Sequence, residues 1–138
     1  MTIINMQTMR YINVLDKVTR VKTRKCFVHN NSVFFAVDRV YVSKAIGPSA
    51  VNVRKIQEQI GKKVKIIRES EGLNDAKRFI EDIVAPVRFK SVELKDGVIL
   101  ITAGSNQTKA SLIGRNKRRY EELRKIVHDY LGSELRII

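Results

Sequence analysis

Apolar residues recur at helical spacing near the start of the chain and then give way to strand-like runs. The helical spacing covers about residues 8–21. Two runs rich in β-branched and aromatic side chains follow, Cys26 to His29 and Val33 to Val37. The Asn-Asn-Ser sequence between them favours a tight turn, because asparagine tolerates left-handed backbone. We therefore expect a helix followed by a β-hairpin.

The next stretch predicts two helices separated by a glycine loop. Asp38 can cap a short helix that reaches Ile46, and Gly47-Pro48-Ser49-Ala50 then interrupts the helical pattern. A second helix ends at Gly61, which can adopt the left-handed conformation of a C-cap, and a strand follows over Val64 to Arg68. The apolar side chains expected to face inward along this second helix are Val53, Ile56 and Ile60.

The same order of elements begins again after Ser70-Glu71-Gly72, the linker that the composition indicates. A helix capped by Asn74 or a neighbour stops at Pro86, because proline cannot continue a helix. The apolar residues expected to line this helix are Leu73, Ala76, Ile80 and Ile83.

A second hairpin is predicted after this helix. The strands Val87–Leu94 and Val98–Thr102 flank a Lys-Asp-Gly sequence, which is a strong hairpin turn. Apolar residues change phase along the first strand, so a bulge or bend is expected near Ser91.

A second glycine loop, Gly114-Arg115-Asn116-Lys117, separates the last two predicted helices. The helix before it begins at Ser105 or Thr108, and the long helix after it ends at Gly132. Leu135 to Ile138 form a final strand. The residues expected to face inward along the long helix are Tyr120, Leu123, Val127, Tyr130 and Leu131.

Two matched motifs indicate that the halves of the chain are repeats. Ala45-Ile46-Gly47 matches Leu112-Ile113-Gly114, and a Gly-x-x-apolar-basic-Ile-Ile motif starts at both Gly61 and Gly132. The first pair of glycines is offset by 67 positions and the second by 71. The four additional residues are about one helical turn, so the second copy is expected to have a longer helix.

Each half thus has the order helix, hairpin, helix, glycine loop, helix and strand. This order resembles a type II KH domain, in which a glycine loop clamps a nucleic-acid backbone. Two such domains in tandem, with Ile46-Gly47-x-x-Ala50-x-Asn52-Val53-Arg54 in the first, resemble the NusA family of transcription factors in its short archaeal-type form. The resemblance covers nearly the whole chain and implies an α+β fold of two tandem type II KH domains, residues 1–70 and 71–138.

Both loops depart from the Gly-x-x-Gly pattern of such domains at the last position. The first loop ends in Ala50 and the second in Lys117. Alanine adds one methyl group, and lysine, which has no branch at Cβ, is expected to keep helical backbone angles. These departures bear on how closely a sugar–phosphate chain can approach each loop.

The charge of the chain indicates a polyanionic partner. The formal net charge is +13, distributed as +10 over residues 1–70 and +3 over 71–138. Lysines and arginines that neutralise phosphates release condensed counterions, which favours nucleic-acid binding. The alternative is a basic surface that only keeps the protein soluble. An acidic membrane surface is disfavoured, because no predicted helix is both strongly basic and rich in Trp or Phe.

The glycine loops are the expected RNA-binding sites. Each opens a helix, so unpaired backbone N–H groups and the positive end of the helix dipole can meet a phosphate. Ile46 and Ile113 either floor an apolar groove for bases or belong to the core. The expected RNA-binding residues are Lys44, Ile46, Gly47, Pro48, Ser49, Ala50, Asn52 and Arg54 in the first copy, and Lys109, Ile113, Gly114, Arg115, Asn116, Lys117 and Arg118 in the second.

Two other nucleic-acid readers fit the sequence less well. A helix–turn–helix motif is the nearest rival, but it normally lies among helices, whereas hairpins precede both loops here. An aromatic platform on a sheet is disfavoured, because no paired aromatic motif is found and Phe34-Phe35 are neighbours that face opposite sides of a strand.

The sequence contains no catalytic constellation. Cys26-x-x-His29 has half the spacing of a zinc site, and His128 alone cannot complete four ligands. Cys26 is expected to be a buried, inert thiol and His29 a solvated residue at the edge of a turn. Neither a Walker A motif nor a dinucleotide fingerprint occurs. We therefore expect no enzyme activity, no catalytic residues, no metal site and no cofactor.

The resemblance implies a single-stranded RNA-binding transcription factor that acts in termination or antitermination with RNA polymerase. The alternative is a KH-type RNA-binding assembly factor, for instance in ribosome biogenesis, that works without polymerase. The expected partners are therefore single-stranded RNA and, by resemblance, RNA polymerase, with no membrane contact and a monomeric state. One cysteine, no apolar run long enough to span a bilayer and no secretory signal favour the cytoplasm.

Overall fold

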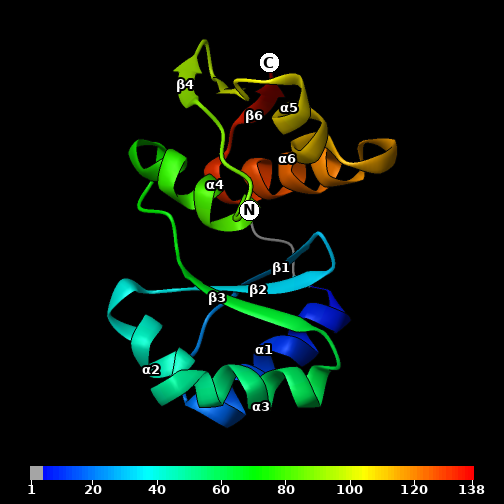
Figure 1. Cartoon of the computed structure of the whole chain (residues 1–138). Coiled ribbons are helices and arrows are strands. Elements are labelled where there is room, and N and C mark those ends of the chain that lie inside the picture. Colours follow the sequence, from blue (N-terminus) through cyan, green and yellow to red (C-terminus); the bar gives the residue numbers. More distant parts are fainter. Residues whose placement is uncertain (1–4) are drawn as a thin grey trace. The chain divides into compact units, whose positions relative to one another are not determined.

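The computed structural model describes residues 5–138 of the chain. They divide into two compact units, the first ending at Glu69 and the second comprising Ser70–Ile138 (Figure 1). Each unit contains helices and a separate three-stranded sheet, which confirms the α+β class. No helix within the described residues is long and apolar enough to cross a membrane.

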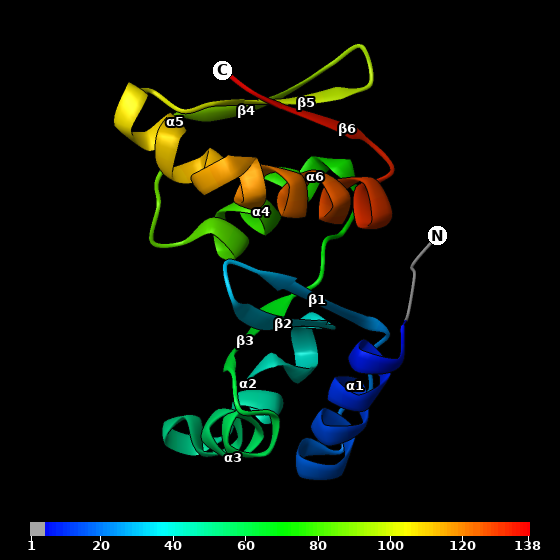
Figure 2. The ribbon, with the colours of Figure 1, turned by 90° about the vertical axis from the view of Figure 1, so that its right-hand side faces the viewer.

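The first unit places its helices on one face of its sheet (Figures 1 and 2). Strand β2 is central, antiparallel to β1 and parallel to β3. Asn30 and Asn31 form the hairpin turn with φ of 49° and 62°, as their tolerance of left-handed backbone predicts. The elements are α1 (Met6–Thr19), β1 (Lys25–His29), β2 (Ser32–Val37), α2 (Val42–Ile46), α3 (Val51–Ile60) and β3 (Lys63–Arg68), with short 3-10 turns at Arg39–Tyr41 and Pro48–Ala50.

Side chains that alternate along the sheet build the core of the first unit. Val33, Phe35 and Val37 point to the helices from β2, where they are fully buried. Tyr11 and Leu15 of α1 and Ile56 of α3 meet them, as the helical spacing predicts. Cys26 also lies in this core, which confirms the predicted burial, and burial raises the pKa of its thiol to about 12, which disfavours the reactive thiolate.

The second unit repeats this topology. Its central strand is β5, antiparallel to β4 and parallel to β6. Ser105 caps α5 by accepting a hydrogen bond from the Thr108 N–H at 3.1 Å, so the first of the two predicted starts, Ser105 and not Thr108, is confirmed. The elements are α4 (Ala76–Val84), β4 (Ser91–Lys95), β5 (Val98–Thr102), α5 (Asn106–Ile113), α6 (Arg118–Leu131) and β6 (Glu134–Ile137), with 3-10 turns at Leu73–Asp75 and Arg115–Lys117.

The helix after the second loop is longer, as the offset between the repeats predicts. Helix α3 has 10 residues and α6 has 14, a difference of about one turn. Both end in a left-handed glycine, Gly61 with φ 77° and Gly132 with φ 64°. The four-residue increment therefore lies in the helix and not in a loop.

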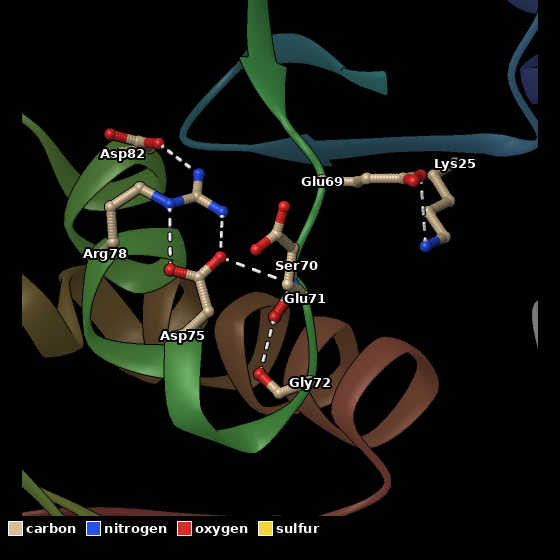
Figure 3. Close-up of polar contacts among 8 residues, drawn as sticks. All are labelled: Lys25, Glu69, Ser70, Glu71, Gly72, Asp75, Arg78 and Asp82. Carbon is tan, nitrogen blue, oxygen red and sulfur yellow. Dashed lines mark hydrogen bonds and ion pairs between the residues drawn. The ribbon is translucent and has the colours of Figure 1, made fainter. Parts of the chain in front are cut away.

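Two predictions about the start of the second unit are wrong. Leu73 does not line the helix but is 43% exposed, and Phe79, at 1% exposure, takes an inward position instead. No side chain caps α4, because the Asp75 carboxylate accepts hydrogen bonds from the Arg78 guanidinium in the first turn. Asp75 and Asp82 also form ion pairs with Arg78 and raise its pKa above the ordinary value, chiefly through the hydrogen bonding of Arg78 to Asp75, which accepts (Figure 3).

The first strand of the second hairpin is shorter than predicted. It starts at Ser91 and not at Val87, because the Val87 N–H bonds to the Val84 carbonyl at 3.0 Å and closes a turn after the helix. The first ladder bond runs from the Lys90 N–H to the Thr102 carbonyl at 2.8 Å. The change of phase in the apolar pattern therefore marks a bend at Lys90, directly before the strand begins, which confirms the bend expected near Ser91.

The sheet of the first unit also differs from prediction at two aromatic positions. His29 is buried and not solvated, because the turn has only two residues and His29 pairs with Ser32 in the ladder. Phe27 lies opposite Phe34 across the hairpin, and the two rings stack with centroids 5.3 Å apart. The sheet thus contains an aromatic pair with one ring from each strand of the hairpin. The sequence analysis considered only Phe34 and its neighbour Phe35, so it did not predict this pair. Both rings are buried.

On either side of the junction, the chain is held by hydrogen bonds within its own unit (Figure 3). The Glu69 N–H continues the ladder of β3 by donating to the Val37 carbonyl at 2.9 Å, and its carboxylate pairs with Lys25 at 3.3 Å. In the second unit, the Ser70 hydroxyl donates to the Gly72 carbonyl at 2.9 Å. The predicted linker therefore starts directly after the last ladder bond of the first unit.

Candidate nucleic-acid interface

The first glycine loop joins α2 to α3 and turns the chain through left-handed backbone (Figure 2). Gly47 has φ 78° and ψ 166°, a conformation that side chains disfavour. Pro48 supplies the first helical angle of the new turn, where its missing N–H is no loss. Ser49 and Ala50 follow at φ 53° and φ 59°. The helix α3 then begins in a new direction.

The second loop, between α5 and α6, has the same backbone conformation. Gly114 has φ 75° and ψ 175°, and Asn116 and Lys117 have φ 57° and φ 61°. The Lys117 N–H donates to the Gly114 carbonyl at 3.2 Å, as the Ala50 N–H does to Gly47 at 3.1 Å. The two loops are therefore the same structure built from different residues.

The expectation that Lys117 keeps helical angles is wrong. The last loop residue is left-handed in both units, because the new helix can start in its own direction only after this turn. A non-glycine residue costs roughly 1–2 kcal/mol in this region. Ala50 and Lys117 both carry this cost where the pattern of the resemblance has glycine, so other contacts must hold the loops.

One such contact is a hydrogen bond that closes each loop at the same register. In the first unit, the Asn52 side-chain amide donates to the Lys44 carbonyl at 3.1 Å. In the second, Arg119 Nη1 donates to the Ser111 carbonyl at 3.2 Å. Each donor lies five residues after the loop glycine and each acceptor three before it. We call this hydrogen bond the loop brace.

The brace also explains why each loop begins with glycine. A Cβ on Gly47 would come within 2.8 Å of the Asn52 side-chain nitrogen, and one on Gly114 within 2.8 Å of Arg119 Cγ. Contacts under 3 Å require the neighbour to move. Glycine is therefore required both by its positive φ and by the side chain that crosses it.

The helices after the loops start without a side-chain cap. Neither Ala50 before α3 nor Lys117 before α6 makes a capping hydrogen bond through its side chain. Helices α1 and α5, in contrast, are capped by Asn5 and Ser105. The N–H groups of Val51 and Arg118 donate to the Pro48 and Arg115 carbonyls of the loops. No side chain competes for the other first-turn N–H groups of α3 and α6, where the helix dipole favours an anion.

The structure gathers the predicted residues around the two loops, one set in each unit. Lys44 and Arg54 are exposed beside the first loop, and the Arg54 guanidinium donates to the Ser49 carbonyl. The exposed polar and charged residues of the second set are Lys109, Arg115, Asn116, Lys117 and Arg118. In the first set Pro48 and Ser49 are exposed, whereas Ile46, Gly47, Ala50 and Asn52 are half-buried, and in the second Ile113 and Gly114 are half-buried.

The two isoleucines before the loops have different surroundings. Ile46 packs against the hydrophobic core of the first unit. Ile113 lines a hollow of about 230 Å³ beside the second loop. Of the two alternatives for these isoleucines, core residue or floor of a groove for bases, Ile46 fits the first. Ile113 lies in a position that fits the second. The other residues that line the hollow are Lys117, Tyr120, Arg136, Ile137 and Ile138.

Several of these residues were missed by sequence reasoning. Arg119 is absent from the residues that the sequence predicts, and so is Arg136, which lies on a strand distant in sequence from the loop. Tyr120 was assigned to the core, but it is half-buried and its hydroxyl donates to the Leu135 carbonyl at 2.9 Å. A signal for Arg119 does exist: both copies place a side-chain donor five residues after the glycine.

The described residues contain no group of three or more His, Cys, Asp and Glu side chains that could hold a metal ion. Cys26 and His29, the half motif for zinc, are both buried in the strand that precedes the first hairpin turn. Loop backbone, exposed basic side chains and one hollow are therefore the chemical features of this interface.

Comparison with known proteins shows that the chain is similar to three archaeal proteins that share one name. The chain is 29% identical over 119 residues to the probable transcription termination protein NusA of Methanocaldococcus jannaschii, an alignment that covers 84% of this chain and 63% of that protein. The protein of the same name from Methanococcus vannielii is 28% identical over 92 residues, covering 67% and 51%. That from Halococcus morrhuae is 24% identical over 120 residues, covering 86% and 84%. The chain thus spans about half to two thirds of the first two relatives.

Among solved structures, the crystal structure of APE1850 matches with a TM-score of 0.67 and 25% identity, over 98% of this chain and 100% of that one. No protein-family model matches the chain. The three curated relatives nevertheless share one name and align over most of the chain. The resemblance that the duplicated glycine loops indicated is thus confirmed, and the chain is similar to archaeal NusA proteins.

Proposed function

We propose that the chain is a single-stranded RNA-binding transcription factor that acts in termination or antitermination together with RNA polymerase. Its two units are then tandem type II KH domains, residues 1–70 and 71–138. The curated relatives support the transcriptional role through their name, probable transcription termination protein. The order of elements and the duplicated loop support the domain assignment.

The observation that carries the proposal is the glycine loop built twice with one backbone conformation. Each loop ends at an uncapped helix whose N–H groups can donate to a phosphate oxygen. Exposed lysines and arginines flank both loops and add attraction for the RNA backbone. In the second unit the hollow beside Ile113 offers an apolar surface to a base. No step of this function requires catalysis or a cofactor.

Loop-directed charge reversal tests the proposal. Binding of a fluorescently labelled, random-sequence single-stranded RNA is measured for Pro48→Asp with Ser49→Asp, and for Arg115→Asp. An inserted carboxylate would meet phosphate at about 4 Å, where one like-charge contact costs on the order of 4 kcal/mol before screening. We expect each variant to bind about tenfold more weakly or worse. Folding should be retained, because acids are tolerated at helix N-termini.

Matched controls place the same charge change away from the loops. Lys62→Asp in the first unit and Lys95→Asp in the second are exposed, and each changes the charge by two, as the loop variants do. Equal losses from loop and control variants would show that net charge alone holds the RNA. Co-purification of the protein with RNA polymerase supports the transcriptional role, whereas exclusive recovery with ribosomal particles would favour an assembly factor.

A further inference from the structure

We propose that Asn52 and Arg119, the donors of the loop brace, are positioning residues that hold each loop in its phosphate-binding conformation. This inference rests on the proposed function, since it concerns how the same loops bind RNA. It assigns Arg119 a role different from that of the neighbouring arginine. Arg118 offers its charge to the RNA, whereas Arg119 shapes the loop.

The loops need such a hydrogen bond because their backbone is costly. Two consecutive non-glycine residues are left-handed in each loop, Ser49 and Ala50 in the first and Asn116 and Lys117 in the second. Each left-handed residue is disfavoured, so a loop without further contacts would relax toward other conformations. The brace joins the helix before the loop to the helix after it, across eight residues in both units. It therefore opposes this relaxation.

The position of Arg119 fits a brace better than a phosphate ligand. Its aliphatic carbons cross directly over Gly114, as the 2.8–3.0 Å approaches to a Cβ built there show. Its guanidinium then reaches the Ser111 carbonyl near the C-terminal end of α5, where the helix dipole favours a cation. Arg119 is half-buried, whereas Arg118 is exposed. The side chain is thus directed to the preceding helix.

The chain contains its own control for separating charge from hydrogen bonding. The first unit makes the same brace with an asparagine, which is neutral. Arg119→Asn therefore removes the charge and keeps a donor of proven reach, while Arg119→Leu removes both. In the first unit, Asn52→Leu removes the donor at similar size, and Asn52→Arg imports the donor of the second unit. The two pairs test the same idea with opposite changes of charge.

The experiment measures the affinity of the four variants for a labelled random-sequence single-stranded RNA over a range of salt concentrations. We expect Arg119→Leu and Asn52→Leu to bind about fivefold more weakly or worse, as the loss of one side-chain hydrogen bond that holds the loop implies. Arg119→Asn should restore binding to within about twofold of the parent, with an unchanged salt slope. Asn52→Arg should bind at least as well as the parent. Thermal unfolding of each variant confirms that folded protein is compared.

A phosphate-ligand role for Arg119 has a different outcome. Arg119→Asn and Arg119→Leu would then weaken binding equally, and each would make the slope of log affinity against log salt shallower by about 0.7. That result overturns the inference, as does parental binding by both leucine variants. If the leucine variants do not fold, the slope and affinity of Arg119→Asn alone decide the point. Failure of the parent chain to bind RNA would instead contradict the proposed function itself.

Discussion

The two glycine loops share one backbone conformation but have opposite side-chain chemistry. The first contains Pro48, Ser49 and Ala50, which are uncharged, whereas the second contains Arg115, Asn116 and Lys117. Both begin with a glycine of positive φ and both are closed by a brace from the same register. The conformation therefore depends on the glycine and the brace, and the middle residues are free to differ in function.

The net charge of each half does not follow the charge of its loop. The half with the uncharged loop carries +10, and the half with the basic loop carries +3. In the first unit most lysines and arginines lie away from the loop, for example Lys62 before β3 and Lys63 at its start. The second unit has less charge but concentrates it at its loop. Under the proposed function, the second loop would attract RNA by local charge, and the first would depend more on close approach of the RNA to its backbone.

Replacement of the loop glycines should have the largest effect and should affect both loops alike. Gly47→Ala and Gly114→Ala each force a side chain into positive φ and against the brace. We expect each change to lower the free energy of unfolding by about 2 kcal/mol or more, measured by chemical denaturation. RNA affinity should fall with it. If only one of the two variants lost stability, the two braces would not contribute equally to the stability of their loops.

Neutralising the second loop should lower affinity by about tenfold at moderate salt, and it should alter the salt dependence. The triple variant Arg115→Gln, Lys117→Gln, Arg118→Gln removes three exposed charges, so the slope of log affinity against log salt should become shallower by about 2. The matched variant in the first unit is Lys44→Gln with Arg54→Gln and Lys55→Gln. We expect a smaller change there, because Arg54 is already engaged with the Ser49 carbonyl. Equal changes in slope would contradict the proposed division of roles.

The labelling rate of the cysteine in the first unit shows whether a substitution destabilises one unit or both. Cys26 is the single cysteine of the chain, it is buried, and burial raises its pKa to about 12. Labelling by a thiol reagent at neutral pH thus requires the first unit to open. A destabilisation of about 2 kcal/mol raises the open population by more than about tenfold, so Gly47→Ala should accelerate labelling by that factor, while Gly114→Ala should leave its rate nearly unchanged. Equal acceleration by both variants would show that the two units open together.

The same raised pKa predicts a loss of stability at alkaline pH. The folded protein keeps the Cys26 proton up to a pH of about 12, whereas the unfolded chain releases it near its ordinary value of 9.0. The unfolded state therefore binds fewer protons between these two values, so stability falls as pH rises through this range. Cys26→Ser should show a weaker fall than the parent when unfolding is followed against pH. If the stability of Cys26→Ser and of the parent fell equally with pH, groups other than Cys26 would dominate the loss of stability at alkaline pH.

Glycine at the last loop position should have the smallest effect. Ala50→Gly and Lys117→Gly relieve left-handed strain but increase the freedom of the unfolded chain, so the net gain should be about 1 kcal/mol or less. Lys117→Gly also removes a charge at the hollow, and we expect its RNA affinity to fall slightly while that of Ala50→Gly is kept. Thermal unfolding and RNA titration of the two variants check this. Destabilisation by either variant would show that the side chain makes an unrecognised contact.

Features that depend on neighbours in the chain were predictable from the sequence alone. The Asn30-Asn31 and Asp96-Gly97 turns, the cap at Ser105 and the left-handed ends at Gly61 and Gly132 occur where predicted. Each is decided by one or two residues, through a left-handed backbone preference in the turns and helix ends and through the side-chain oxygen at Ser105. The repeat likewise predicted a helix longer by one turn, since the number of residues between matched glycines does not depend on tertiary contacts.

Features that require distant residues to meet were decided only by the tertiary structure. His29 is buried because a two-residue turn places it in the ladder, and Phe27 meets Phe34 only once the hairpin pairs. The brace from Arg119 and the hollow that includes Arg136 join residues from separate elements. Left-handed backbone at Lys117 has the same origin, because a helix packed in its own direction imposes that angle on a residue that would not adopt it by preference.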